Sequence, residues 1–242
     1  TQRTVWATRM PAAMGPEASS SGGSHPEVLS VRSEGVIHDA TMQSLTMLLL
    51  DNSFWSWQGA QRSLMQIVVP DQLWVQHSNM LASVPSIDPR DFICACAHAE
   101  EPDGSRIFIE RSVEDEAWPP QEEAVRAWRF LAIQLCPMPR EALHGQGDAV
   151  QVKIVLQIDL GDVNEHFTSE FALESAEIIN SISAYTARPG WKAEYMRLKA
   201  EGPSHPPPRR YEHPRRGSDR SSGHARGHGH GGRGDGKQAV GG

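Results

Sequence analysis

Two cysteines and a histidine at alternate positions are the residues of this chain whose types and spacing best suit catalysis or metal binding. Cys94, Cys96 and His98 are spaced i, i+2 and i+4, so on a β-strand they share one face. A thiol beside a histidine could support proton transfer, and two thiols could begin a zinc site. The pair lacks two further thiols or suitably spaced histidines, however, and a lone histidine near a turn is more often solvated or hydrogen-bonded. We therefore interpret both cysteines as small apolar residues of a wall.

Motifs of known enzymes are absent from the sequence. It contains no G-x-S-x-G, P-loop, H-E-x-x-H or dinucleotide fingerprint after a strand. Glu114-Asp115-Glu116 and Glu122-Glu123 bring carboxylates together, but such runs in turn regions are usually solvated. An enzyme would need polar groups that converge inside a cavity. The candidates are Gln76, Ser78, His98, Arg111 and Arg126. We expect no catalytic residue, no metal and no cofactor.

The residues around these cysteines predict a β-hairpin with apolar side chains on both faces. Residues 90–98 and 105–113 flank a turn at Pro102-Asp103-Gly104. Phe92 lies on the same face as the cysteines, whereas Ile93 shares the other face with two alanines. A sheet that is apolar on both sides is either covered on both or walls a cavity. We expect a hollow that holds an apolar molecule.

The remaining pattern predicts an α+β fold. Alternating apolar residues indicate strands at 5–10, 28–37, 64–69, 73–78, 125–136 and 150–160. A first helix is expected after a cap at Asp39 and ends at Asp51. A long second helix, capped by Thr168 or Ser169, ends before Arg188 and carries an apolar stripe. This order favours a curved antiparallel sheet that wraps around a long C-terminal helix.

Six short motifs resemble the START family of lipid-transfer domains. In chain order they are Arg90-Asp91-Phe92, Asp103-Gly104-Ser105, Arg111-Ser112-Val113-Glu114-Asp115, Pro119-Pro120, Val125-Arg126-Ala127 and Ile158-Asp159-Leu160-Gly161. No single motif is specific, but their shared order argues against coincidence. The resemblance covers residues 28–185 and implies the family's helix-grip fold, with an internal hydrophobic cavity.

The resemblance implies that the chain binds, transfers between membranes or senses a lipid or other hydrophobic ligand in a cavity gated by the C-terminal helix. The candidate cavity and lid residues are Trp74, Ser78, Phe92, Cys94, Cys96, Phe171, Ile178, Ile179 and Ile182. Alternatively, the helical stripe simply closes a filled core. Two other functional classes stay open: a helix-grip cyclase or hydrolase acting on a hydrophobic substrate, and a ligand-sensing regulatory module of a larger protein.

The chain departs from the family pattern in three places, which indicates a distant member. In sterol-binding members an acidic residue and an arginine pair inside the cavity, and the matching positions here are Ser78 and Cys96. We therefore expect a cavity without an ion pair, which removes support for a sterol over a phospholipid, a fatty acid or a pigment. The usual tryptophan-aspartate pair appears as Trp55-Ser56-Trp57-Gln58, and Gly161 lacks the following tryptophan and proline.

The charge is distributed unevenly along the chain. The net charge is −7, yet residues 203–242 carry eight basic and three acidic side chains. The first 202 residues therefore hold 15 basic and 27 acidic side chains, a net charge of −12. An acidic body argues against nucleic-acid binding. We expect a lipid-binding domain at 1–200, with a flexible loop at 11–26, and a disordered basic tail at 201–242.

The tail has three interpretations: an arm that contacts anionic membrane, an Arg-Gly segment that contacts RNA, or a passive extension. Three cysteines, no leader and no apolar run of about eighteen residues favour a cytoplasmic, soluble chain. We expect a monomer, and the first interpretation of the tail adds a transient, peripheral contact with anionic membrane. The chain begins at Thr1 without a methionine, so it is expected to be a fragment or a processed product.

Overall fold

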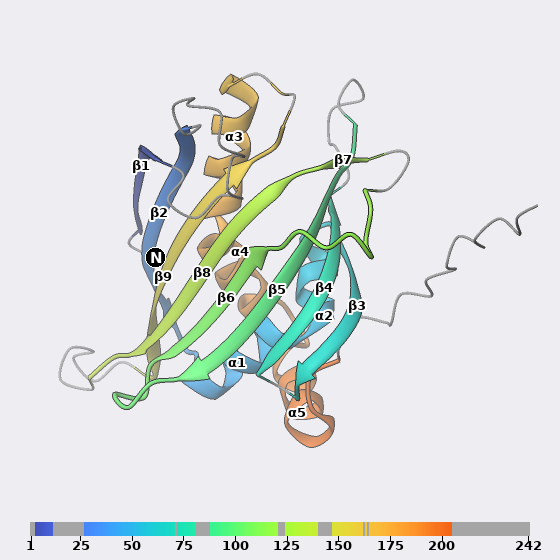
Figure 1. Cartoon of the computed structure of the whole chain (residues 1–242). Coiled ribbons are helices and arrows are strands. Elements are labelled where there is room, and N and C mark those ends of the chain that lie inside the picture. The colour runs from blue at the N-terminus through green and yellow to red at the C-terminus, as the bar shows by residue number, and fades with distance from the viewer. Residues whose placement is uncertain are drawn as a thin grey trace, which may run out of the picture. The chain divides into compact units, whose positions relative to one another are not determined.

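The centre of the protein is a curved antiparallel sheet (Figure 1). The computed structural model describes residues 3–11, 27–70, 72–80, 88–120, 124–139, 147–161, 163 and 165–204. The strand order is β1-β2-β9-β8-β6-β5-β4-β3, and β7 joins β5 in parallel. The strands are β1 (Arg3–Pro11), β2 (Glu27–His38), β3 (Ala60–Val69), β4 (Leu73–Met80), β5 (Arg90–Glu100), β6 (Arg106–Ser112), β7 (Val125–Arg126), β8 (Trp128–Pro137) and β9 (Ala149–Asp159).

Alternation along the central strands builds one continuous inner face. In β9 the even-numbered residues 150–158 are buried, whereas the odd-numbered residues 151–157 are only half-buried. The register aligns Trp74, Cys96, Glu110, Leu131 and Leu156 in one row across five strands. Apolar residues dominate this row, so the row lies in the core. One charged residue, Glu110, interrupts it.

The structure divides one predicted strand into two. Residues 125–136 were expected to form a single strand, but Ala127 separates β7 from β8. The backbone N–H of Ala127 donates to the carbonyl of Asp91 at 3.0 Å, which holds this short segment against β5. The chain then crosses to β6, where β8 pairs. Backbone pairing with two different strands explains the break.

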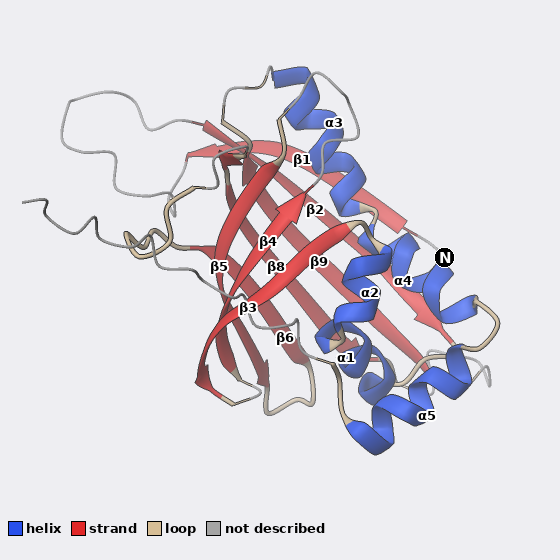
Figure 2. Cartoon of the chain, turned by 90° about the vertical axis from the view of Figure 1, so that its right-hand side faces the viewer, coloured by secondary structure: helices blue, strands red, loops and turns tan. Residues whose placement is uncertain are grey.

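The helices lie on one face of the sheet (Figure 2). They are α1 (Met42–Leu50), α2 (Asn52–Trp57), α3 (Glu165–Ala176), α4 (Ile178–Ala187) and α5 (Trp191–Glu201). The predicted C-terminal helix is thus divided into α3 and α4 at Glu177, and α2 and α5 were not predicted. Contacts of α3 with β2 and β9, and of α4 with β2, place the helices over the inner face. This arrangement confirms the helix-grip fold.

The cap of the first helix differs from the prediction. Asp39 has φ of +56°, a left-handed conformation that does not suit an N-cap, which needs an extended backbone. Thr41 is the cap instead: its hydroxyl accepts from the Ser44 N–H at 3.1 Å, and Ser44 Oγ accepts from the Thr41 N–H at 3.0 Å. Together these bonds form a capping box.

Two predicted segments lie largely outside the described residues. These are the loop at 11–26, of which the structure describes Pro11, and the tail at 201–242, of which it describes 201–204. Glu122-Glu123 also lies outside them. All the described residues belong to one compact unit. Among the described residues, none of the helices is both long enough and apolar enough to cross a membrane.

Candidate ligand cavity

A small cavity lies between the inner face of the sheet and the helices. Its volume is about 100 Å³. The walls come from α2, α3, α4 and strands β3, β8 and β9. The lining residues are Trp55, Gln58, Ala60, Arg62, Arg129, Leu131, Leu156, Ile158, Phe171 and Ile178. A second void of about 20 Å³ shares Trp55, Arg62 and Leu131 with the first and extends toward β4, β5 and β6.

Three charged side chains meet beside both voids. Arg62 Nη2 donates to Glu110 Oε1 at 2.6 Å, and Arg129 Nη2 donates to Glu110 Oε2 at 2.8 Å. The three side chains are 5 to 10% exposed. We call Arg62, Glu110 and Arg129 the buried triad. Each arginine uses one N–H for the shared carboxylate, and the Nε–H groups of both arginines are buried without a hydrogen-bond partner among the described residues.

The electrostatics of the buried triad leave it with a positive charge. Burial opposes ionisation of Glu110, but the two guanidinium groups outweigh it and lower the pKa of that carboxyl. Burial lowers the pKa of Arg62, whereas for Arg129 burial is outweighed by the attraction of Glu110 together with smaller contributions from Cys94 and Cys96, so the pKa is raised. Both arginines stay protonated, because the guanidinium pKa is far above neutral. Two cations and one anion give a net charge of +1.

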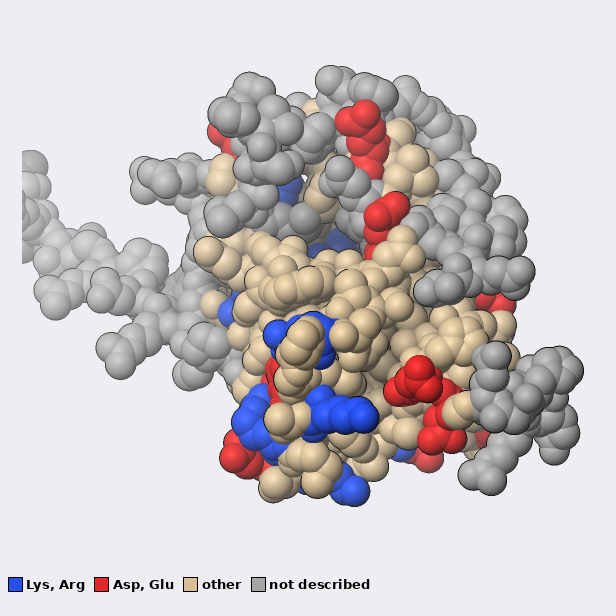
Figure 3. All heavy atoms as spheres, turned by 180° about the vertical axis from the view of Figure 1, so that it is seen from behind, with Lys and Arg blue, Asp and Glu red and all other residues tan. Residues whose placement is uncertain are grey.

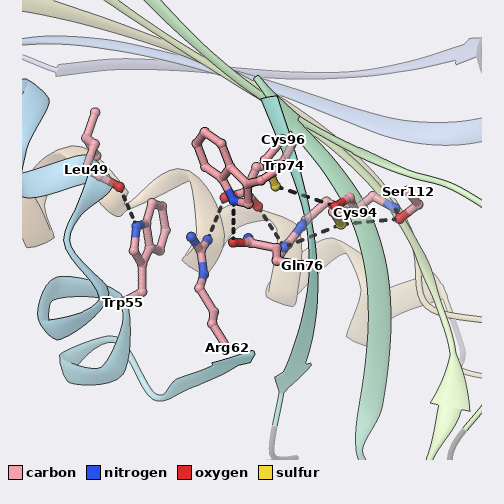
Figure 4. Close-up of polar contacts among 10 residues, drawn as sticks. Leu49, Trp55, Arg62, Trp74, Gln76, Cys94, Cys96 and Ser112 are labelled. Carbon is pink, nitrogen blue, oxygen red and sulfur yellow. Dashed lines mark hydrogen bonds and ion pairs between the residues drawn. The ribbon is translucent and has the colours of Figure 1, made fainter. Parts of the chain in front are cut away.

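Aromatic rings and thiols surround the buried triad. The Arg62 guanidinium carbon lies 3.7 Å from the ring centroid of Trp55, and that of Arg129 lies 4.7 Å from the ring of Phe92. Trp55 is fixed by its own Nε1–H, which donates to the Leu49 carbonyl at 2.8 Å. Figure 4 shows Arg62 extending from β3 toward Gln76 and Trp74. Packing therefore holds the guanidinium groups in place.

The structure places the predicted site residues in several settings. Phe171 and Ile178 line the larger void, and Trp74 and Cys96 line the smaller one. Cys94 contacts the triad through Arg129 Nη2, 3.9 Å from its Sγ. The other four, Ser78, Phe92, Ile179 and Ile182, are fully buried and line neither void. All nine lie in or beside the core, and their role in ligand binding stays a prediction.

The two cysteines have the environment of wall residues. Both are free and buried. Burial raises the pKa of Cys94 and of Cys96, with a contribution from nearby Glu110 in each case. Both thiols are therefore neutral at physiological pH, which disfavours nucleophilic chemistry.

The expectation of a cavity without an ion pair is wrong. Ser78 and Cys96 are uncharged, but the buried triad supplies charge from β3, β6 and β8 instead. A signal for it was present in the sequence. Glu110 shares a strand face with Phe108, and Arg129 shares one with Leu131 and Ile133. A charged residue on an apolar strand face must find a buried partner.

The candidate polar groups for an enzyme do not converge on one cavity. Gln76 and Ser112 are aligned with Cys94 on the inner side, so Arg111 points to the opposite side of the sheet. His98 stacks on Phe108 with ring centroids 4.6 Å apart, and Arg126 pairs with Asp91. The run Glu114-Asp115-Glu116 is exposed, as expected.

A wider depression of about 800 Å³ lies on the outer face of the sheet. Its lining includes Arg111, Arg126, Trp128 and Asp159. Arg111 and Asp159 are exposed, so the depression is open to solvent and does not exclude water from a bound apolar group. The inner voids, although smaller, match a hydrophobic ligand better.

The helix-bearing side carries much uncharged surface (Figure 3). Most of the basic side chains visible in this view lie in its lower part, around α5, and a few lie higher up. Lys192 and Lys199 of α5 are exposed, and Met196 beside them is 61% exposed.

Comparisons with known proteins identify solved structures that have the same fold. No family model matches the sequence, and none of the curated proteins matches it. Solved structures do match. Human STARD10 aligns with a TM-score of 0.57 at 15% identity, over 85% of this chain and 80% of that one. Human StAR-related lipid transfer protein 5 aligns with a TM-score of 0.54 at 17% identity, over 71% and 76%.

A third solved structure also aligns with this chain at low sequence identity. The lipid transfer and protein localization domain of human StarD13 (DLC2) aligns with a TM-score of 0.50 at 18% identity, over 64% of this chain and 77% of that one. At these identities the likeness establishes the fold. The chain has the START-like helix-grip fold, as its motifs predicted.

Proposed function

We propose that this protein binds a lipid or another hydrophobic ligand between the curved sheet and the helices α2, α3 and α4. The observation that carries the proposal is the void beneath α3 and α4, whose apolar walls include Leu131, Leu156, Ile158, Phe171 and Ile178. The structural neighbours named for lipid transfer share the fold. Burial of apolar surface supplies roughly 0.8 kcal/mol per methylene.

The size of the void supports a gated site. Ligand pockets usually enclose about 300–1,000 Å³, whereas this void measures about 100 Å³. This conformation is therefore too small for a lipid chain, which enters only if a wall moves. Strands β8 and β9 are hydrogen-bonded to neighbouring strands on both sides, whereas α3 and α4 are joined at Glu177, whose side chain makes no capping hydrogen bond to the second helix. We assign the moving wall to α3 and α4.

A substitution that fills the void tests the proposal. Leu131 lines both voids, so Leu131→Trp occupies space that a ligand needs. We expect this variant to lose at least tenfold of the native rate of lipid exchange between vesicles, and to lose any lipid that native mass spectrometry finds with the purified native protein.

Leu135→Phe is the matched control. Leu135 lies on the same face of β8 as Leu131, is fully buried and lines neither void. The larger phenylalanine therefore overpacks the core, at a cost of about 1–3 kcal/mol, without occupying the site. We expect exchange to continue in this variant. The proposal fails if Leu131→Trp folds and exchanges lipid at the native rate.

A further inference from the structure

The buried triad is not explained by stabilisation of the fold alone. A buried ion pair contributes little net stability, because desolvation of the charges offsets their attraction. Compared with a neutral ion pair, the triad contains one additional buried arginine. Among the described residues, the ion pairs of Arg62 and Arg129 both go to Glu110, and Cys94 and Cys96 remain neutral thiols. The net charge of +1 on the triad is therefore not compensated by another ion pair among the described residues.

The hydrogen-bonding capacity of the arginines is also incomplete. The Nε–H of Arg62 and the Nε–H of Arg129 are buried and have no partner among the described residues. A buried donor without an acceptor costs about 1–3 kcal/mol. Both residues line the larger void, so a molecule within it can reach the guanidinium groups.

We propose that the cavity accepts a single-chain amphiphile with a carboxylate head, such as a fatty acid, and that Arg62 and Arg129 bind this head. The inference rests on the proposed function and names its ligand class. A carboxylate carries the single negative charge that neutralises the triad. It is planar, and its two oxygens match the fork of guanidinium N–H groups.

The other walls of the void have the apolar character that the tail of the same molecule needs once α3 and α4 have moved. Leu131, Leu156, Ile158 and Phe171 line it together with the arginines, so charge is confined to one part of a mostly apolar wall. Trp55 covers one face of the Arg62 guanidinium and Phe92 lies against that of Arg129, so bulk water has little access to either group. In such a setting a charge-assisted hydrogen bond is stronger than it is in water.

A panel of ligands with one chain length tests the proposal. Nile red, a neutral apolar dye, reports occupancy of the native chain and is displaced by dodecanoate, methyl dodecanoate, dodecanol or dodecyl phosphate, with acetate as a head without a tail. We expect dodecanoate to bind about tenfold tighter than the ester and the alcohol, since one charge-assisted bond has roughly that effect. Acetate should not compete at similar concentrations.

Variants locate the preference in the buried triad. Arg129→Gln leaves the neutral Arg62–Glu110 pair, and we expect the preference for dodecanoate to fall to less than about threefold. Arg129→Lys keeps the charge and should retain most of the preference. Arg32→Gln is the control, because this side chain is 56% exposed on β2. Circular dichroism verifies that each variant is folded.

Each alternative result has a defined meaning. Equal affinity for dodecanoate, its ester and dodecanol in the native chain overturns the assignment of a carboxylate head and leaves the proposed function standing. Tighter binding of dodecyl phosphate than of dodecanoate overturns it in favour of a phosphate head. Competition by acetate as strong as that by dodecanoate shows a small-anion site and also overturns it. If no compound of the panel binds, the proposed function fails as well.

Discussion

Asp91 shows how one side chain holds a long connection in place. It is completely buried. Its two oxygens accept from Arg126 Nε and Nη2 at 3.0 and 3.1 Å, and His77 Nε2 lies 3.6 Å from Oδ2. Arg126 also donates to the Trp118 carbonyl at 3.0 Å. The Asp91 carboxylate thus ties the segment between β6 and β8 to β5.

Replacement of this carboxylate tests its contribution to stability. Asp91→Asn keeps the shape but removes the charge that Arg126 neutralises. Because the Arg126 side chain is 24% exposed and can turn toward water, we expect a loss of about 2 kcal/mol in the free energy of unfolding, below the full cost of an unpaired buried charge. Urea denaturation measures this loss.

The exposed pair of Glu100 and Arg106 is the control. Their charged groups lie 2.9 Å apart, but the Glu100 side chain is 58% exposed. Glu100→Gln should therefore cost less than about 0.5 kcal/mol. Equal effects of the two substitutions would contradict the role assigned to Asp91.

At the scale of elements, α1 shows how a short helix is fixed at its start. It has nine residues, too few to be stable alone. The capping box of Thr41 and Ser44 satisfies two backbone N–H groups there. α1 leads directly into α2, whose Trp55 covers Arg62 in the cavity, so the cap helps to position one wall of the site.

Thr41→Ala should destabilise the protein by about 1 kcal/mol, because the N–H of Ser44 loses its acceptor. The side chain is exposed, so little packing changes. Thr41→Ser keeps the hydroxyl and should retain nearly the native stability. Thermal unfolding of both variants measures the difference, and an equal loss in both would show that the hydroxyl is not the cause.

The whole molecule should be sensitive to acid through Asp91 and Glu110, two buried carboxylates whose pKa is lowered. Burial opposes ionisation of Asp91, but His77 and Arg126 outweigh it and lower its pKa from the ordinary 3.8. The pKa of Glu110 is lowered from the ordinary 4.5. A lowered pKa means that the folded state holds its protons less tightly than the unfolded chain.

This stabilisation is fully present above the unfolded values, and it is lost as the pH falls through the lowered values. We expect the free energy of unfolding to be insensitive to these two groups above about pH 5 and to decrease steeply below pH 4. Asp91→Asn should flatten this decrease. An unchanged acid dependence in the variant would show that other groups are responsible.

Local patterns predicted much of the fold. The hairpin of β5 and β6 and the long strand β9 were evident, because period-two alternation of apolar residues is typical of a strand and does not fit the 3.6-residue period of a helix. The stripe through Ile178, Ile182 and Tyr185 predicted a terminal helix, whereas α5 has no comparable stripe and was missed. The interruption at Ala127 depends on a backbone bond to Asp91, which is distant in sequence.

The sequence by itself determined the alternation of the strands, the helical stripe and therefore a hollow α+β fold. Only the tertiary structure decided how the charged side chains that line the hollow pair with one another. Arg62, Glu110 and Arg129 are separated by 48 and 19 residues, and only the pairing and curvature of the sheet bring them within hydrogen-bonding distance. Charge compensation inside a core depends on distance in space, which local spacing along the chain does not encode.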